Sequence, residues 1–311
     1  MNNVASVKDR LNNVRRKTGK TMEQLLVTYG LERTIYRISI SPYADKFTLK
    51  GGIFLYAIFD GNFVRMTTDI DLLAQEISND VERMKTVFTE ILSQEADDPL
   101  KYDVSAIEVV PITEFKEYHG VKVSTIAYLD RTRIPISIDI GFGDVVYPER
   151  LKMEFPSVLD DNGPSVYAYS IESCIAEKFE ALVSLGYDNS RFKDYYDIYV
   201  LATTHDFEGS KLQEAIVETF RHRNTSLQKE IVAFEEGFTE DAIRTSRWNS
   251  FVKKKRTLVP VGFAESIEMI KSFIIPVVNA INAGESFAAK WLANSRQWII
   301  QREKDNGSSD N

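Results

Sequence analysis

The chain has 311 residues, 43% of them hydrophobic and 27% charged, a composition typical of folded globular proteins rather than disordered chains. The single cysteine, Cys174, excludes a disulfide framework and a CxxC zinc or redox site, and three widely separated histidines argue against a histidine-built zinc site. The net charge of −8 argues against polyanion binding over the whole surface. Since no apolar leader follows Met1 and no apolar run is long enough to span a membrane, we expect a cytoplasmic, soluble protein.

Charge is unevenly distributed along the chain. Residues 1–20 carry six bases and one acid, residues 69–108 carry eleven acids and three bases, and residues 244–256 carry six bases beside two aromatic residues. An acidic middle between basic ends is typical of a metal-binding centre flanked by surfaces that contact a polyanion. Solvated helix faces at the two ends are an equally good interpretation.

The N-terminal half predicts a small α/β domain. Apolar residues at helical spacing predict two helices within the first forty residues, the second of which ends at Ser41-Pro42. The patterns that follow predict a strand over 47–50, a helix over 53–59, a strand over 65–74, a helix over 79–95, and strands over 104–112, 121–129 and 134–142.

The C-terminal half predicts a helical domain. After an expected linker around 148–164, helical patterns cover 171–185, 192–204, 209–223, 227–237, 238–254, 260–282 and 284–302. We therefore expect an α/β domain over 1–165, including N-terminal helices over 1–44, a helical domain over 166–304 and a disordered tail over 305–311.

Two aspartates are the first candidates for chemistry. On an extended strand Asp69 and Asp71 point to the same face, about 6–7 Å apart, while Ile70 points to the buried side. Two carboxylates about 4 Å apart repel by about 4 kcal/mol at an effective dielectric near 20, and a divalent cation such as Mg²⁺ relieves that repulsion. Because a lone Asp-x-Asp is common, a solvated strand face is the alternative.

A second acidic strand strengthens the metal interpretation. In the segment ISIDIG the isoleucines share one face, so Asp139 points the other way. If the two strands are neighbours, three carboxylates meet on one face of the sheet, as a two-metal phosphoryl-transfer centre requires. Gly51-Gly52, directly before an apolar helix, lets backbone N–H groups approach a phosphate, although such a turn is weak evidence alone.

Three sequence blocks together resemble a known family. In order, over roughly residues 45–203, they read LKGG…RMTTDIDLL, ISIDIGFGD and SIESCIAEKFEALVSLG…SRFKDYYDIYVL. The Gly-Gly turn, the Asp-x-Asp and the later third Asp are similar to the polymerase-β-type nucleotidyltransferase superfamily. The fuller pattern resembles the AbiEii/AbiGii-type nucleotidyltransferase toxins of bacterial toxin–antitoxin and phage abortive-infection systems. Gly52 departs from the superfamily pattern, since many members have Ser there and with it a hydroxyl contact to the phosphate.

The resemblance implies an α+β fold, with a polymerase-β-like domain built on a mixed or antiparallel sheet and a helical domain after it. It also implies a toxin, dependent on Mg²⁺ or alternatively Mn²⁺, that transfers a nucleoside monophosphate from an NTP to RNA and arrests growth. The expected acceptor is the 3′ end of tRNA, and a separately encoded antitoxin is the expected partner. The residues implied are Asp69, Asp71 and Asp139 as catalytic metal ligands, Lys178 and Asp194 as further catalytic residues, and Gly51, Gly52, Arg65, Thr67, Lys178 and Asp197 in nucleotide binding.

A plain ion pair between helices is the alternative for Lys178. Asp194 and Asp197 lie three residues apart on the next predicted helix and share a face, so Lys178 can pair with both. The resemblance favours Lys178 as a triphosphate ligand held in place by Asp194.

The basic segment near residue 250 is the candidate RNA surface. Its cations would hold the RNA backbone and its tryptophan would stack on a base; the alternative is a solvated helix end with the tryptophan in the core. The residues concerned are Arg244, Arg247, Trp248, Lys253, Lys254 and Lys255. Two other functions stay open: a nucleotidyltransferase that modifies a protein or a small molecule such as an aminoglycoside, and a non-enzymatic nucleotide- or RNA-binding regulator.

Overall fold

A computed structural model describes residues 3–63, 65–113, 119–159, 163–227, 230–254 and 260–300, apart from the side chains of Thr113, His119 and Lys254. Its contacts divide the chain into two units, one made of Met1–Asp144 and Glu149–Tyr169 and the other of Val145–Pro148 and Ser170–Asn311. The predicted tail over 305–311 lies outside the described residues. Among the described helices, none has both the length and the apolar character needed to cross a membrane.

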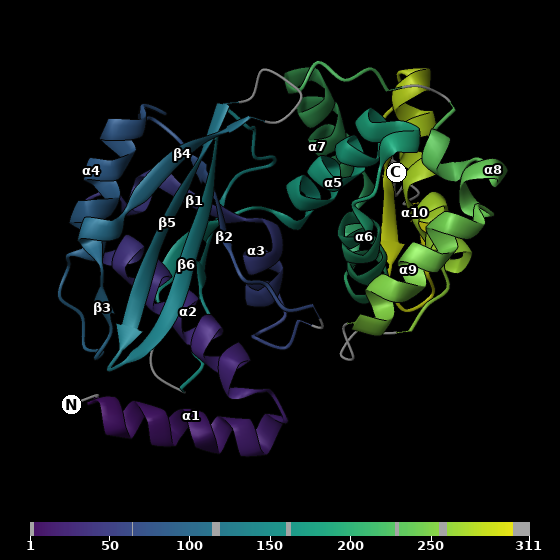
Figure 1. The fold of residues 1–311 in the computed structure, drawn as a ribbon. Coiled ribbons are helices and arrows are strands. Elements are labelled where there is room, and N and C mark those ends of the chain that lie inside the picture. Colours follow the sequence, from purple (N-terminus) through teal and green to yellow (C-terminus); the bar gives the residue numbers. More distant parts are fainter. Residues whose placement is uncertain are drawn as a thin grey trace, which may run out of the picture. The chain divides into compact units, whose positions relative to one another are not determined.

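The first unit is built on a mixed sheet (Figure 1), as the sequence predicts. The described residues form eight strands: β1 (Phe47–Lys50), β2 (Ile70–Ala74), β3 (Lys101–Tyr102), β4 (Glu108–Thr113), β5 (His119–Leu129), β6 (Thr132–Phe142), β7 (Leu151–Glu154) and β8 (Ser165–Ala168). Their order is β3-β5-β6-β2-β1-β8-β7, and β4 also pairs with β5. Strand β2 runs parallel to β6 and β1 runs parallel to β8, whereas the other pairs are antiparallel.

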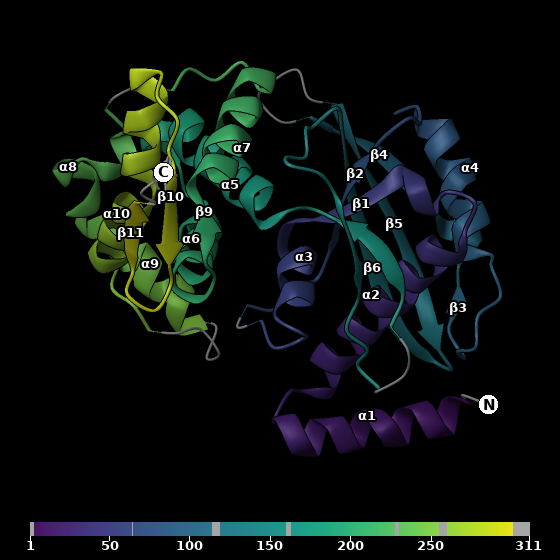
Figure 2. The same ribbon diagram turned by 180° about the vertical axis from the view of Figure 1, so that it is seen from behind.

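Helix packing decides which face of this sheet is apolar. The helices of the unit are α1 (Val4–Thr18), α2 (Met22–Ile40), α3 (Gly51–Ile58) and α4 (Val81–Leu92). Helix α2 lies along the sheet (Figure 2), and a Cβ added at Gly30 would lie 2.7 Å from the Ile134 side chain of β6. The alternate isoleucines of β6 therefore point toward α2 and are buried, which leaves Ser137, Asp139 and Gly141 on the opposite face.

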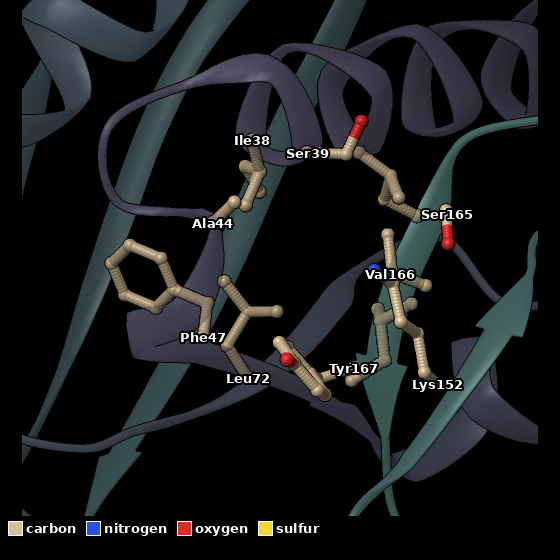
Figure 3. A pocket seen from close by; sticks show the side chains of 11 residues that line it. Ile38, Ser39, Ala44, Phe47, Leu72, Lys152, Ser165, Val166 and Tyr167 are labelled. Atoms are coloured by element: carbon tan, nitrogen blue, oxygen red, sulfur yellow. The ribbon is translucent and has the colours of Figure 1, made fainter.

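A cavity of about 200 Å³ lies on the α2 side of the sheet (Figure 3). Its lining is mostly apolar: Ile35, Ile38, Ser39, Ala44, Phe47, Leu49, Leu72, Lys152, Ser165, Val166 and Tyr167. Because Leu49 and Leu72 alternate with Lys50 and Asp71 along their strands, the cavity and those charged residues are on opposite faces. This cavity is therefore separate from the candidate chemistry.

The second unit is mostly helical, as expected. Its helices are α5 (Ile171–Leu185), α6 (Phe192–Thr204), α7 (Gly209–His222), α8 (Glu236–Thr239), α9 (Ala242–Lys254) and α10 (Phe263–Ala283). It also contains a small antiparallel sheet that the sequence patterns do not predict, with strands β9 (Phe207–Glu208), β10 (Ala289–Leu292) and β11 (Gln297–Ile300) in the order β11-β10-β9.

The predicted helix over 284–302 is wrong, because these residues form the β10–β11 hairpin. Along β10, Ala289 and Trp291 are buried while Lys290 is exposed, which is the alternation of a strand. The indole N–H of Trp291 donates to the Ala202 carbonyl at 2.7 Å, and that of Trp298 donates to the Phe273 carbonyl at 2.9 Å. These bonds to α6 and α10 are tertiary contacts, which short-range periodicity does not reveal.

Three other sequence-based predictions need correction. The predicted helix over 227–237 is wrong: within its described part the structure has a 3₁₀ turn at Val232–Phe234 and only the start of α8. The predicted strand over 65–74 begins only at Ile70. The predicted linker around 148–164 contains β7, whose pairing with β8 places a two-strand extension on the edge of the sheet. In each case the missing information is pairing between segments distant in sequence.

Candidate active site

Three carboxylates meet on the face of the first sheet opposite α2. Asp71 on β2 and Asp139 on β6 are directly paired in the parallel register of these strands. Asp69 lies just before β2, and one oxygen from each of the three residues lies within 4.8 Å of the others. The two acidic strands are thus neighbours, which is the condition on which the sequence-based interpretation depends.

Asp69 owes its position to local hydrogen bonds rather than to the strand on which it was expected. The Thr67 hydroxyl lies 3.1 Å from Asp69 Oδ1, and the backbone N–H of Thr68 donates to the same oxygen at 3.3 Å. Thr67 is 7% exposed, so its hydroxyl is held within the fold beside the carboxylate. The turn before β2 therefore brings Asp69 toward Asp71 although it is not part of the ladder.

The Gly-Gly turn allows α3 to begin against Asp71. Gly51 has a φ of +63°, and a Cβ at this position would lie 2.0 Å from Asp71 Oδ2. The N–H of Gly52 donates to the same oxygen at 3.3 Å. A Cβ at Gly52 would lie 3.1 Å from both Arg65 Nη2 and Thr67 Oγ1, so these side chains line the space that a larger residue would enter. The structure thus brings together Gly51, Gly52, Arg65, Thr67, Asp69, Asp71 and Asp139.

Two lysines that sequence reasoning did not select extend the acidic pair into one row across four strands. Lys122 on β5 pairs in register with Asp139, and Lys50 at the end of β1 pairs with Asp71. We call Lys122, Asp139, Asp71 and Lys50 the charged row. Alternation within each strand predicts that both lysines share a face with polar residues, but only the register shows that they flank the carboxylates.

The two lysines of the charged row have different partners. Lys122 Nζ lies 2.7 Å from Asp139 Oδ1, whereas Lys50 Nζ donates to Asp144 Oδ2 at 2.7 Å and lies 5.3 Å from the centre of the Tyr169 ring. Lys50 and Asp144 are 15% and 5% exposed, while Lys122 and Asp139 are 39% and 29% exposed. Lys50 is therefore held in a largely buried ion pair, and Lys122 is held by Asp139 at the surface.

The donor set of the three aspartates fits a hard divalent cation. All the ligand atoms are carboxylate oxygens, which suit Mg²⁺ and Mn²⁺. Asp139 Oδ1 is also a buried atom without a hydrogen bond, since Lys122 approaches it outside hydrogen-bonding geometry. A buried carboxylate oxygen in this state is suited to take part in coordination.

The second unit contains a separate buried ion cluster. Lys178 Nζ on α5 donates to Asp194 Oδ1 at 3.2 Å and to Asp197 Oδ2 at 2.8 Å on α6. Both carboxylates are at most 1% exposed, and Arg191 Nε donates to Asp194 at 2.7 Å. The ion pair that was one of the two interpretations of Lys178 is therefore present. Nearby, burial raises the pKa of the Cys174 thiol to about 12, so this cysteine stays protonated at neutral pH.

The basic segment on α9 differs from the predicted RNA surface. Trp248 is fully buried, and its indole N–H donates to the Val261 carbonyl at 2.8 Å, so its expected stacking on a base is wrong. Arg244 donates to the carbonyls of Tyr187 and Asn189 and stacks on Phe238, which commits its guanidinium within the fold. The remaining cations of this segment divide into exposed Arg247 and Lys253, and Lys254 and Lys255, whose side chains lie outside the described residues.

Comparison with known proteins accounts for the arrangement around the carboxylates. Residues 33–268 match the model of the family described as nucleotidyl transferase AbiEii toxin, type IV toxin–antitoxin system. The chain belongs to this family. Membership makes it a nucleotidyltransferase of the AbiEii toxin type and implies a nucleotide substrate and a cognate antitoxin. No curated relative matches the sequence.

Solved structures share this fold at low sequence identity. The AbiEii-type chain is similar to MenT4, a nucleotidyltransferase toxin from Mycobacterium tuberculosis, with a TM-score of 0.50, 14% identity, and coverage of 87% of this chain and 98% of that one. It also matches a candidate nucleotidyltransferase from Helicobacter pylori with a TM-score of 0.46, 16% identity and coverage of 82% and 95%. A third match, JHP933 from H. pylori, has a TM-score of 0.42, 14% identity and coverage of 83% and 97%.

The Gly51 turn gives a direct test of the geometry around Asp71. Gly51→Ala should reduce nucleotide transfer by about 10²-fold, because its Cβ would displace the Asp71 carboxylate. Gly19→Ala is the matched control: Gly19 has a φ of +71° but nothing within 4 Å of an added Cβ. The control should show only the cost of a positive φ, about 1–2 kcal/mol in thermal or urea unfolding, with transfer retained. Equal transfer by the two variants would contradict the close contact at Asp71.

A double variant separates the structural from the nucleotide-binding role of Lys178. Lys178→Met alone should cost about 3–5 kcal/mol of unfolding free energy, because it leaves two carboxylates buried without their lysine. Adding Asp197→Asn removes one of these charges and should restore part of that stability. If Lys178 also binds triphosphate, calorimetric NTP affinity stays at least about tenfold low in the refolded double variant.

Exposed Lys211, which pairs with exposed Glu208, provides the control as Lys211→Met, with stability and NTP affinity both unchanged. Recovery of NTP affinity together with stability in the double variant would assign Lys178 to the ion pair alone.

Proposed function

We propose that this chain is a Mg²⁺-dependent toxin that transfers a nucleoside monophosphate from an NTP to the 3′ end of tRNA. Its action in the cytoplasm would block aminoacylation and arrest growth, which suits phage defence by abortive infection. The observation that carries the proposal is the meeting of Asp69, Asp71 and Asp139 on one sheet face in a chain of the AbiEii family. The antitoxin that neutralises it would be encoded separately.

In the proposed reaction, a hydroxyl oxygen of the acceptor attacks the α-phosphorus in line. The bond from that phosphorus to the β-phosphate oxygen breaks, and pyrophosphate leaves. A bound divalent cation would neutralise developing charge and orient the phosphates. Asp69 and Asp71 would be its main ligands, and Asp139 would complete the set and accept the proton from the attacking hydroxyl. Positioning and charge neutralisation would supply most of the rate acceleration.

The nucleotide phosphates would be held by residues around the α3 turn. Arg65 and Thr67 lie at the start of this turn, 3.1 Å from the position of a Cβ at Gly52, and the resemblance assigns both to phosphate contact. Thr67 also contacts Asp69, so one side chain would connect phosphate binding with the carboxylates. Lys178, positioned by Asp194 and Asp197, would bind the triphosphate in the same proposal.

The acceptor RNA would bind exposed cations rather than the tryptophan of α9. Arg247 and Lys253 on α9 are exposed, as are Arg15, Arg16 and Lys17 in the last turn of α1. Since the chain is acidic overall, RNA affinity must come from such local basic surface and must fall as salt concentration rises.

Label transfer from each α-³²P-NTP to total RNA tests the proposal. With Mg²⁺, one NTP should label a band of tRNA size, and a chelator should abolish the labelling. Asp71→Asn should reduce the rate by about 10²–10³-fold, equivalent to several kcal/mol of transition-state stabilisation. Exposed Asp130 provides the control as Asp130→Asn, which should retain full activity. Thermal melts should show that both variants are folded.

Each alternative acceptor has a distinct outcome in the same experiment. Label recovered in protein, or in an aminoglycoside added in place of RNA, would replace tRNA as the acceptor. Absence of label from all four NTPs with every acceptor, in folded wild-type protein, would contradict nucleotide transfer and favour a binding role.

A further inference from the structure

Lys122 is a fixed cation at the edge of the carboxylate cluster. It lies directly across the β5–β6 ladder from Asp139, and its Nζ is 2.7 Å from Asp139 Oδ1. Ser137, two residues from Asp139 on the same face, accepts a weaker contact from the same ammonium at 3.4 Å. Because strand pairing fixes the positions of both backbones, this lysine is part of the site's architecture rather than a mobile surface group.

The charges at the cluster favour a specific stoichiometry. Three carboxylates contribute −3 and Lys122 contributes +1, so the set has a net charge of −2, which one divalent cation neutralises. Lys50, at the other end of the charged row, is already paired with Asp144. The carboxylate that Lys122 covers is Asp139, which leaves Asp69 and Asp71 as the pair open to a first ion.

We propose that Lys122 is a built-in competitor for cation binding at Asp139, which limits the site to one divalent ion before nucleotide binds. A second ion then enters only with the negative charge of the triphosphate, which draws Lys122 away from Asp139. This inference rests on the proposed function, and it adds an order of binding to it. The physical basis is repulsion between an ammonium and a divalent cation that share one carboxylate.

Mn²⁺ binding without nucleotide tests the inference, with free Mn²⁺ measured by electron paramagnetic resonance. Wild-type protein should bind one ion per chain. Lys122→Met should bind the first ion at least about tenfold more tightly and should also bind a second. Adding Asp139→Asn to Lys122→Met should abolish the second ion, and Lys122→Arg, which keeps the charge, should behave like wild type.

Lys8→Met is the matched control, since it also removes a lysine–aspartate pair of the first unit, at 3.2 Å from Asp130. It should leave Mn²⁺ binding unchanged, and thermal melts confirm that each variant is folded. Equal Mn²⁺ affinity and stoichiometry in wild type and Lys122→Met would overturn the role of Lys122 while leaving nucleotide transfer intact. Absence of Mn²⁺ binding in both would overturn the metal-dependent function together with this inference.

Discussion

The parallel pairing of β2 with β6 places Asp71 beside Asp139, and the candidate active site depends on that register. A shift of one residue in either strand would turn its carboxylate toward α2 and an isoleucine toward solvent. The isoleucines of β6 oppose such a shift, because each is at most 2% exposed on the α2 side. Full burial of an aliphatic side chain contributes about 1.5–3 kcal/mol, so several of them can hold the acidic residues together against their mutual repulsion. The apolar face of the sheet thus determines the geometry of its charged face.

The same face contains the groups that make the carboxylate cluster tolerable without a ligand. The N–H of Gly52 at the start of α3 donates to Asp71, the Thr67 hydroxyl contacts Asp69, and Lys122 is paired with Asp139. Each aspartate therefore has one stabilising neighbour from a different element of the fold. This division suits a site that binds and releases charged ligands, because a cation or phosphate can exchange with these partners without a change of fold.

Local sequence patterns predict the acidic site better than they predict its surroundings. Alternation along β6 is enough to place Asp139 on the polar face, and helical spacing is enough to bring Lys178 within reach of α6. The positions of Lys122 and Lys50 depend on register between strands, which no short window of sequence contains. The role of Trp248 could not be predicted for a similar reason, since its burial depends on partners such as Phe192 and Phe263 on other helices. The β10–β11 hairpin was missed because four alternating residues are too short a signal to outweigh a helical pattern.

A crystal structure with Mn²⁺ and a non-hydrolysable NTP analogue would test the central claim most directly, through the anomalous signal of the metal. The account predicts Mn²⁺ within coordination distance, about 2.0–2.6 Å, of oxygens from Asp69 and Asp71, with Asp139 contacting the same ion or a second one. The α-phosphate should bind the same Mn²⁺. Anomalous density that contacts none of the three carboxylates, with the nucleotide bound elsewhere on the chain, would contradict the account.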